Sequence, residues 1–301
     1  MPYDLIIIGA GPAGITAAVY AARKKMNFLV ITRDIGGQAA WSGDIENYTG
    51  YQFVTGPELV SKFEEHMRKY RIDSKEGEDV LDVEKSGDAI VVRTNRSRYE
   101  AKTVIIASGK FSRELGVPGE KEFKNKGLTY CATCDGPLFA GKDVAVIGGG
   151  NSALDAALQL VRIARKVYII NNTPRLGGDA VMKEKVETSA NVTVLNDSRV
   201  TAITGSKMVG GVTVSRNGRE ESIAVEGIFV EIGLVPNSGF AKTVERNANG
   251  EIKISARNET NIPGIFAAGD VTDVPEKQII IAAGEGSKAV LSAFKYISQQ
   301  L

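Results

Sequence analysis

One pattern of strand, turn and helix occurs twice in the 301 residues, and it restricts the fold more than any other feature of the sequence. The apolar run Leu5–Ile8 precedes a G-x-G-x-x-G turn at residues 9–14, and Val144–Ile147 precedes a G-x-G-x-x-A turn at residues 148–153. Apolar residues then follow each turn at helical spacing. A second apolar run completes each unit: Phe28–Ile31 after the first turn and Val167–Ile170 after the second. This order is typical of a βαβ unit that binds a nucleotide, so the sequence predicts two α/β nucleotide-binding domains.

Glycine lets these turns approach a phosphate closely. It has no Cβ, so the backbone N–H groups can reach a pyrophosphate, and the start of the following helix adds positive partial charge. A purely structural turn is the alternative, and it is harder to dismiss for the second turn. The candidate nucleotide-binding residues are Gly9, Gly11, Pro12, Ala13 and Gly14 in the first turn, and Gly148, Gly150, Asn151 and Ala153 in the second.

The composition is that of an ordinary globular protein, and it excludes several functions. Apolar residues make up 43% of the chain and charged residues 24%, with a formal net charge of +1. A disordered chain would be less apolar and more highly charged, and a nucleic-acid-binding surface would show a basic excess. The sequence begins without a basic leader segment, and no apolar run approaches the ~20 residues that span a bilayer. We therefore expect a soluble, cytoplasmic protein with no nucleic-acid or membrane partner.

The two cysteines of the chain, Cys131 and Cys134, form a single C-x-x-C motif. Because a zinc site usually needs four ligands and the chain has one histidine, the sequence predicts no metal site. A disulfide-stapled secreted protein would carry more cysteines, spread apart. The motif therefore favours thiol–disulfide chemistry at a helix start, where the helix dipole lowers a thiol pKa, and the adjacent Asp135 could move protons. Two inert, buried neighbours or a metal clip are the alternatives.

The second βαβ unit lacks the side chains that usually bind the adenosine ribose of a pyridine nucleotide. An acidic residue at the end of the second strand contacts the ribose hydroxyls of NAD, and an arginine accommodates the 2′-phosphate of NADP. Here the strand is followed by Asn171 and Asn172, so neither a carboxylate nor an adjacent arginine pair is present. The first unit offers only a displaced Asp34.

Six motifs together make the whole chain similar to the low-molecular-weight thioredoxin reductases, which are FAD-dependent pyridine nucleotide-disulfide oxidoreductases. They are GAGPAG at 9–14, GGQ at 36–38, IENYTG at 45–50, CATCDGPLF at 131–139, GGGNSA at 148–153 and GIFAAGD at 264–270. Two further segments resemble the flavoprotein half of bacterial alkyl hydroperoxide reductase. They are GIFVEIGLVPN at 227–237 and KQIIIAAGEGSKA at 277–289.

The resemblance implies an α/β fold of two nested Rossmann-like domains, each a three-layer ββα arrangement, with a discontinuous FAD domain. Residues 1–112 would begin the FAD domain, residues 113–240 would form the NAD(P)-type domain that carries the C-x-x-C, and residues 241–301 would complete the FAD domain. Family members rotate one domain against the other. The expected hinges lie near Lys110–Arg113 and Pro236–Phe240.

The resemblance also implies roles for individual residues. Cys134 would face the flavin, Cys131 would attack the disulfide of thioredoxin, and Asp135 would donate and accept the proton. The implied FAD contacts are Gly9, Gly11, Pro12, Ala13, Gly14, Gly37, Gln38, Asn47, Gly109, Asp270, Gln278 and Ile279. The implied contacts with the nicotinamide cofactor are Gly148, Gly150, Asn151, Ala153 and Asn171.

The chain departs from the family at the 2′-phosphate site. NADPH-using members carry a His-Arg-Arg cluster and a further arginine where this chain has Asn171, Asn172, Thr173 and, further on, Gly177. NADH-preferring relatives tend to carry a glutamate at the position of Asn171. We therefore expect little use of NADPH, and NADH or another donor, such as reduced ferredoxin or a reduced deazaflavin, in its place.

The sequence thus predicts an FAD-dependent thioredoxin-disulfide reductase whose partner is thioredoxin or a thioredoxin-like protein. As in the family it resembles, the chain would form a homodimer. A reductant would deliver two electrons to FAD, which would pass them to the Cys131–Cys134 disulfide. Two alternatives stay open: a reductase of another thiol carrier, glutaredoxin-like or peroxidase-coupled, and a flavin-binding redox sensor without rapid turnover.

Overall fold

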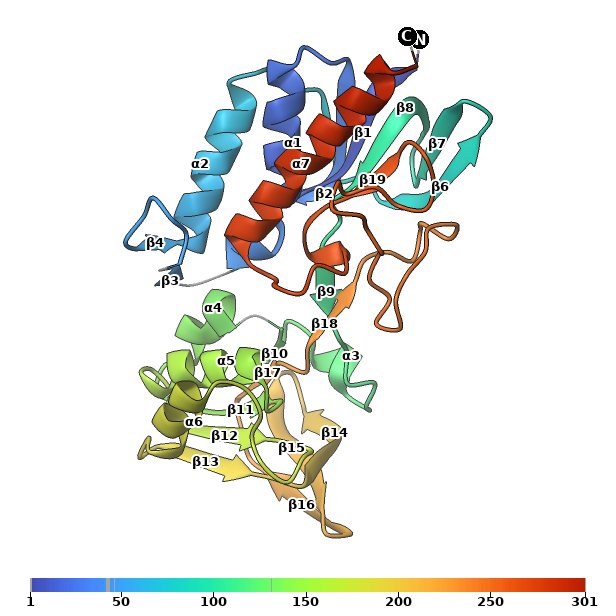
Figure 1. The fold of residues 1–301 in the computed structure, drawn as a ribbon. Coiled ribbons are helices and arrows are strands. Elements are labelled where there is room, and N and C mark those ends of the chain that lie inside the picture. Colours follow the sequence, from blue (N-terminus) through green and yellow to red (C-terminus); the bar gives the residue numbers. More distant parts are fainter. Residues whose placement is uncertain (1, 42–43, 46, 131, 301) are drawn as a thin grey trace. The chain divides into compact units, whose positions relative to one another are not determined.

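The computed structural model describes residues 2–41, 44–45, 47–130 and 132–300, and the chain forms two compact units (Figure 1). The first unit contains residues 1–111 and 235–301, and the second contains residues 112–234. Cys131 lies outside the described residues. Of Cys134, the structure describes only its backbone position in a short helix.

The first unit is built on the predicted βαβ motif, with β1 at the centre of a parallel sheet between β2 and β8. β5 pairs with β2, and β19 pairs with β8. β8 also continues into an antiparallel meander with β7 and β6. The strands are β1 (Tyr3–Ala10), β2 (Phe28–Ile35), β3 (Asp44–Ile45), β4 (Val54–Thr55), β5 (Ser74–Glu76), β6 (Val80–Ser86), β7 (Ala89–Thr94), β8 (Arg98–Ile106) and β19 (Ile265–Ala267). The helices are α1 (Pro12–Arg23), α2 (Gly56–Arg68) and α7 (Ile279–Ser298), with 3-10 turns η1 (Gly37–Trp41) and η3 (Gly269–Val271).

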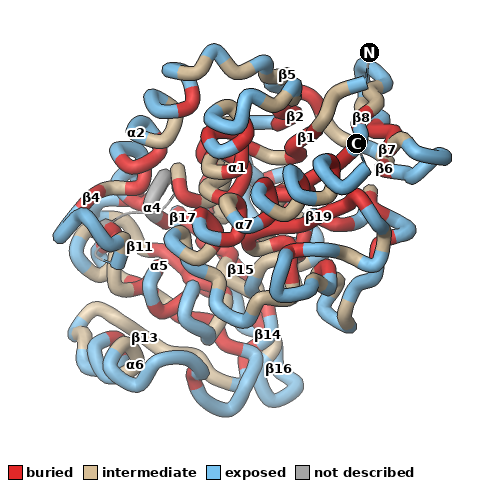
Figure 2. Tube along the Cα trace, turned by 45° about the horizontal axis from the view of Figure 1, so that its top comes forward, coloured by how far each residue is buried: buried red, intermediate tan, exposed pale blue. Residues whose placement is uncertain are grey.

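The side chains of β1 alternate between two apolar layers. Most of the strand is buried, as its colour in Figure 2 shows. Leu5 and Ile7 pack in a cluster with residues of α1 and α7. Ile6 and Ile8 point to the opposite face and pack in a cluster with residues of the meander. Burial on both faces is what a continuous apolar run such as Leu5–Ile8 predicts for a central parallel strand.

The second unit repeats this plan. Its five parallel strands follow the order β10-β17-β11-β12-β13, which again places the strand before a glycine turn, β11, in the interior. A cluster with α5 covers one face, and the antiparallel strands β14, β15 and β16 cover the other. The strands are β10 (Leu128–Thr129), β11 (Asp143–Ile147), β12 (Lys166–Ile170), β13 (Val192–Leu195), β14 (Ser198–Gly205), β15 (Val209–Arg216), β16 (Arg219–Ile223) and β17 (Gly227–Val230). The helices are α3 (Glu120–Phe123), α4 (Ala132–Asp135), α5 (Asn151–Val161) and α6 (Ala180–Glu187), with the 3-10 turn η2 (Gly136–Phe139).

Each unit therefore has a helical layer, a parallel sheet and an antiparallel β layer, and the predicted α/β fold class is confirmed. Asn217 and Gly218 form the turn of a hairpin in which Arg216 pairs with Arg219, and both turn residues have positive φ angles, as a two-residue hairpin requires.

The second boundary between the units differs from the expected one. The structure changes units at 234/235 rather than 240/241, whereas the first change, at 111/112, lies one residue from the expected 112/113. The physical reason is a set of hydrogen bonds that hold the intervening segment on the first unit. The Asn237 N–H donates to the Gly109 carbonyl over 2.9 Å, and the Ser238 hydroxyl donates to the Gly250 carbonyl over 2.6 Å. The connecting strands β9 (Lys110–Ser112) and β18 (Leu234–Pro236) pair with each other.

Helix α7 approaches α1 at a contact that only glycine permits. A Cβ added to Gly286 would lie 2.0 Å from the carbonyl oxygen of Ala13. Both α1 and α7 contribute buried residues to the same apolar cluster, so their spacing fixes one face of the sheet. In the described part of the chain, no helix is both long enough and apolar enough to cross a membrane, α7 included.

This contact predicts that Gly286→Ala lowers the free energy of unfolding by about 1–3 kcal/mol, because the added methyl group must push the two helices apart. Gly284→Ala is the matched control. It changes the same helix at a position where a Cβ would meet no described atom within 4 Å. This control should gain about 0.5–1 kcal/mol from the better helix propensity of alanine. Urea unfolding of both variants measures the difference, and equal effects would contradict the packing account.

Candidate active site

The first glycine turn is held in a shape that excludes side chains. Gly9 has a φ of +102°, and a Cβ there would lie 2.3 Å from the carbonyl oxygen of Ala107. A Cβ on Gly14 would lie 1.9 Å from the carbonyl oxygen of Gly9. Helix α1 begins at Pro12 with Gly11 as its N-cap residue, and no described side chain caps it. The N–H groups of the first helical turn are thus left to bind an anion.

The second glycine turn has the same construction. Gly148 has a φ of +137°, and a Cβ there would lie 2.2 Å from the carbonyl oxygen of Glu231. Helix α5 follows with Gly150 as its N-cap residue, again without a cap from a described side chain. Two other helices differ: Thr55 forms a capping box at α2, and the Asp179 carboxylate caps α6. Both helices that follow the predicted nucleotide turns therefore begin with N–H groups that no described side chain caps.

Of the predicted FAD residues outside the first turn, Gly37 and the segment of Asp270 lie close to it. A Cβ on Gly37 would lie 3.3 Å from the Gly11 Cα, and a Cβ on Gly269, next to Asp270, would lie 2.9 Å from the Ala13 Cβ. The other predicted residues of this unit also have described positions. The Asn47 amide donates to Gln278 Oε1 over 3.0 Å, Gln38 Nε2 donates to the Lys110 carbonyl over 3.2 Å, Gly109 has a φ of +64°, and Ile279 begins α7. At Gly9, Gly14 and Gly269 the close approaches leave no room for a Cβ, which suits a turn whose backbone comes near a dinucleotide.

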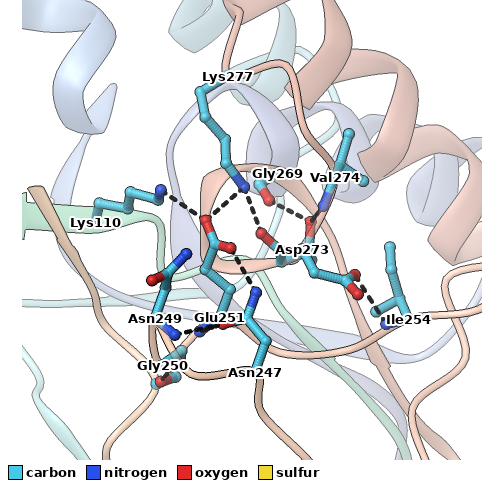
Figure 3. Close-up of polar contacts among 12 residues, drawn as sticks. Lys110, Asn247, Asn249, Gly250, Glu251, Ile254, Gly269, Asp273, Val274 and Lys277 are labelled. Carbon is cyan, nitrogen blue, oxygen red and sulfur yellow. Dashed lines mark hydrogen bonds and ion pairs between the residues drawn. The ribbon is translucent and has the colours of Figure 1, made fainter.

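A buried ion cluster that the sequence did not reveal lies in the same unit (Figure 3). The Glu251 carboxylate accepts from Lys110 Nζ over 2.9 Å and from Lys277 Nζ over 3.1 Å. All three side chains are largely buried, with 12% of Glu251 exposed. Asn247 Nδ2 also donates to Glu251, over 2.8 Å, and Lys277 Nζ also donates to the Thr272 carbonyl. One carboxylate therefore holds two ammonium groups from segments far apart in the chain.

The lysines of this cluster also act on the pKa of the Asp270 carboxyl. Burial raises the pKa of the Asp270 carboxyl, although the positive charges of Lys277 and Lys110 oppose the shift. For Glu251, the groups that lower the pKa have a larger effect than burial. Burial also raises its pKa, but the hydrogen bonds from Asn247, Lys110 and Lys277 outweigh it and bring the pKa to about 2. Glu251 is therefore ionised at neutral pH, and it keeps both lysines in place beside the predicted flavin residues.

Carboxylates also fix the segment around the C-x-x-C motif in the second unit. Tyr130, the residue before Cys131, donates its hydroxyl to Glu120 Oε1 over 2.8 Å. The buried Glu120 carboxylate also accepts from the backbone N–H groups of Leu115 and Gly116, over 2.7 Å each. Burial and Glu120 together raise the pKa of Tyr130. Asp135, the predicted proton carrier, ends α4 and accepts a hydrogen bond from the Thr129 hydroxyl.

Glu231 is a second residue that sequence reasoning missed. It follows β17, is half-buried, and its carboxylate accepts a hydrogen bond from the Ala132 N–H at the start of α4. Burial and the nearby Asp155 raise the pKa of Glu231 to about 8, against the opposing effect of that hydrogen bond. The only signal in the sequence is a carboxylate directly after an apolar strand. The position of this carboxylate depends on the pairing of β17 with β11, which the sequence alone does not predict.

Asn151 and Asn171, the predicted contacts with the nicotinamide cofactor, form hydrogen bonds with other residues of the second unit. Asn171 is 2% exposed, and its amide donates to the Thr173 carbonyl over 3.0 Å and to Asn196 Oδ1 over 2.9 Å. Asn151 Oδ1 accepts from the Asp179 N–H over 2.7 Å. A direct contact of Asn171 with a ribose would have to break these bonds. Its amide instead shapes the loop beneath the second turn, where a Cβ on Gly149 would lie 2.3 Å from its Oδ1 atom.

Comparison with known proteins shows the family and the fold of the chain. The sequence profile of the family described as "Pyridine nucleotide-disulphide oxidoreductase" matches residues 3–286. The chain belongs to this family, whose members bind FAD and a pyridine nucleotide. Its fold is that of the thioredoxin reductases: the crystal structure of Lactococcus lactis thioredoxin reductase superimposes with a TM-score of 0.91 at 35% identity and covers 99% of each chain.

Curated relatives carry two other names. A Bacillus subtilis protein named NADH dehydrogenase is 43% identical over 299 residues, which cover 98% of this chain and 59% of that protein. A Pseudomonas aeruginosa protein named as one component of alkyl hydroperoxide reductase is 45% identical over 303 residues, which cover 98% of this chain and 58% of that protein. The similarity to thioredoxin reductases and to the alkyl hydroperoxide reductase flavoprotein is thus confirmed, and the chain spans less than two thirds of these curated relatives.

The ion cluster predicts a pH-dependent loss of stability in Glu251→Gln. Because the pKa of Glu251 is lower in the folded chain than its usual 4.5, its contribution is fully present above about pH 4.5 and is lost as the pH falls toward 2. At pH 7 the variant should lose about 3 kcal/mol of unfolding free energy, because two buried ammonium groups lose their counter-charge. The difference from wild type should shrink when the pH is lowered from 5 to 3.

Glu84→Gln is the control for this experiment. Glu84 pairs with Arg93 over 2.7 Å in the same unit, but both side chains are about half exposed, so its removal should cost less than about 1 kcal/mol. Urea unfolding at pH 7, 5 and 3 measures both variants. A loss in Glu251→Gln that is independent of pH would contradict the account.

Proposed function

We propose that the chain is a flavoprotein disulfide reductase that passes two electrons from a reductant, through bound FAD, to the Cys131–Cys134 pair and then to thioredoxin or a thioredoxin-like protein. The observation that carries the proposal is the place in the sequence of the chain's only two cysteines relative to α4. They bracket the start of α4, in the unit that also holds the second glycine turn. The proposal includes a homodimeric assembly, which the family resemblance implies, and the cytoplasmic location expected from the sequence.

The first unit has the features of a flavin site. The uncapped start of α1 and the glycines around it would hold the FAD pyrophosphate, and Asp270, Gln278 and Ile279 would lie along the rest of the cofactor. Bound FAD would supply the capacity to accept a hydride from a donor, which no side chain of the protein has. The residues of the chain bind and orient this group, and Glu251 keeps Lys110 and Lys277 in the positive cluster beside Asp270.

The second unit would perform the thiol chemistry. Reduction of the Cys131–Cys134 disulfide takes up two electrons and two protons and yields two thiols. The Cys131 thiolate then attacks one sulfur of the partner's disulfide, so that a mixed disulfide forms and one partner thiolate leaves and takes up a proton. The Cys134 thiolate attacks the Cys131 sulfur, restores the intramolecular disulfide and releases the second partner thiol. Asp135, held by Thr129, would carry the proton at this site.

The proposal predicts that Cys131→Ser and Cys134→Ser each reduce the rate of thioredoxin reduction at least about 1000-fold, because each variant lacks one of the two sulfurs that the exchange needs. FAD binding should be unchanged, since the cysteines lie in the other unit. The assay follows thioredoxin thiols as they form, and the flavin absorbance spectrum checks cofactor content. Ser206→Ala, which leaves both cysteines in place, is a control at an exposed position between β14 and β15 of the same unit.

A second candidate function is the reduction of another thiol carrier. The relative named for alkyl hydroperoxide reductase is 45% identical to this chain, which favours a carrier linked to a peroxidase. Substitution of a peroxidase-linked, thioredoxin-like domain for free thioredoxin in the same assay distinguishes the two. If the cysteine double variant still reduced either carrier, both versions of the proposal would be wrong.

We further propose NADH as the electron donor. The loop after β12 offers Asn171 and Asn172 where a 2′-phosphate would need arginines, and the Asn171 amide is already bonded within the loop. A relative named NADH dehydrogenase at 43% identity agrees with this choice.

Anaerobic mixing tests the donor. NADH should bleach the flavin absorbance at least about 100-fold faster than NADPH at equal concentration, because the 2′-phosphate would carry its charge into a loop without a basic clamp. Thr173→Arg should raise the rate with NADPH relative to that with NADH. Faster bleaching by NADPH in wild type would contradict the proposal, and bleaching by reduced ferredoxin alone would replace NADH as the donor.

A further inference from the structure

Glu231 occupies a position that has an equivalent in the first unit. The Glu231 N–H donates to the carbonyl of Ile147, the residue before Gly148, over 2.7 Å. In the first unit the Ala107 N–H donates to the carbonyl of Ile8, the residue before Gly9, over 2.8 Å. The carbonyl oxygens of Glu231 and Ala107 also lie where a Cβ on the turn glycine would fall, at 2.2 and 2.3 Å. The two residues therefore make equivalent backbone contacts with the two glycine turns.

The side chains at this shared position differ. Ala107 ends in a methyl group that is 5% exposed, and the fold of the first unit is complete with it. A carboxylate is thus not required for the turn or for the pairing of the strands. In the second unit the same position carries the half-buried side chain of Glu231, and burial of a carboxyl group has a free-energy cost unless a partner offsets it. The difference between the units suggests a task for the Glu231 carboxyl beyond folding.

The partner of the carboxyl group is the cysteine helix. Glu231 accepts a hydrogen bond from the N–H of Ala132, the residue that separates Cys131 from Thr133 and Cys134 and begins α4. Asp155 of α5 is, among the described residues, the charged group that raises the pKa of this carboxyl group. From the glycine turn, Gly148 contributes only backbone. Glu231 therefore links the second nucleotide turn to the backbone between the two cysteines.

We propose that Glu231 is a positioning residue for the thiol chemistry: its carboxyl group holds the start of α4, and its charge state sets how readily the Cys131–Cys134 pair forms a thiolate. The inference deepens the proposed function and rests on it, since it requires that the two cysteines are redox-active.

The electrostatic consequence follows from the sign of the charges. Burial and Asp155 place the pKa of Glu231 at about 8, so the carboxyl group is mainly neutral at pH 7 and ionised above pH 8. Neutral Glu231 leaves a nearby thiolate undisturbed. Ionised Glu231 adds a negative charge beside the motif, which raises the pKa of the thiols. Because the groups are coupled, thiolate formation in the wild type should extend over a wider pH range than a single thiol would need.

The test is the pH dependence of thiol alkylation in Glu231→Gln. The FAD-loaded protein is reduced, freed of reductant under anaerobic conditions, and treated with iodoacetamide between pH 5 and pH 10. Because the chain contains only two cysteines, all alkylation reports on this motif. Glu231→Gln keeps the size of the side chain and removes its charge. The variant should reach half of its maximal rate about one pH unit below the wild type, with a steeper profile.

Two further variants complete the experiment. Glu231→Ala should shift the profile in the same direction, and the equivalent Ala107 indicates that the fold accepts alanine here. Glu226→Gln, at the exposed position before β17, removes a charge from the other end of the strand and should leave the profile unchanged. Superimposable profiles for wild type and Glu231→Gln would overturn the inference, as would an equal shift in Glu226→Gln.

The same samples separate this inference from the proposed function. Before reduction, the oxidised protein should resist alkylation because the cysteines form a disulfide. If that disulfide forms and only the pH profiles coincide, Glu231 has no such role and the proposed function stands. If the oxidised protein is fully alkylated without reductant, no disulfide exists, and the inference is overturned together with the proposed function.

Discussion

The contact between a glycine turn and the end of the neighbouring strand is the constraint on which both units depend. At Gly9 and at Gly148 the backbone of the next strand lies where a Cβ would be. This contact sets the start of α1 and α5, and it leaves their first N–H groups without a side-chain cap from the described residues. An anion at these helix ends would gain both the hydrogen bonds and the helix dipole. The same few glycines are thus needed both for packing and for the binding of a nucleotide.

The sequence predicted the elements that are local and periodic, such as the strands before the glycine turns, because apolar runs and turn residues act over short distances. It could not predict contacts between distant segments. Lys110 and Glu251 are 141 residues apart, and neither carries a motif. Glu231 likewise lies beside the second glycine turn only because β17 pairs with β11. The misplaced boundary near residue 240 has the same origin, since the bonds of Asn237 and Ser238 reach back to segments that sequence spacing does not connect.

Two glutamates show how one residue type serves two tasks. Glu251 is surrounded by two ammonium groups and an amide, so its pKa falls to about 2 and it acts as a permanent negative charge. Burial and the nearby Asp155 carboxylate raise the pKa of Glu231 to about 8, against the opposing effect of one N–H group, so its charge changes within the physiological range. The first is suited to holding side chains beside a cofactor. The second is suited to responding to, or acting on, groups that titrate near neutrality.

The central claim is that electrons from a donor reach the cysteine pair through the flavin, and mass spectrometry of alkylated protein tests it most directly. The oxidised, FAD-loaded protein is mixed anaerobically with one equivalent of NADH, quenched with iodoacetamide and compared with a sample that lacks FAD. The account predicts two alkyl groups on the peptide that contains Cys131 and Cys134, and only in the sample with both FAD and donor. A reduced flavin with both cysteines still unalkylated would contradict it.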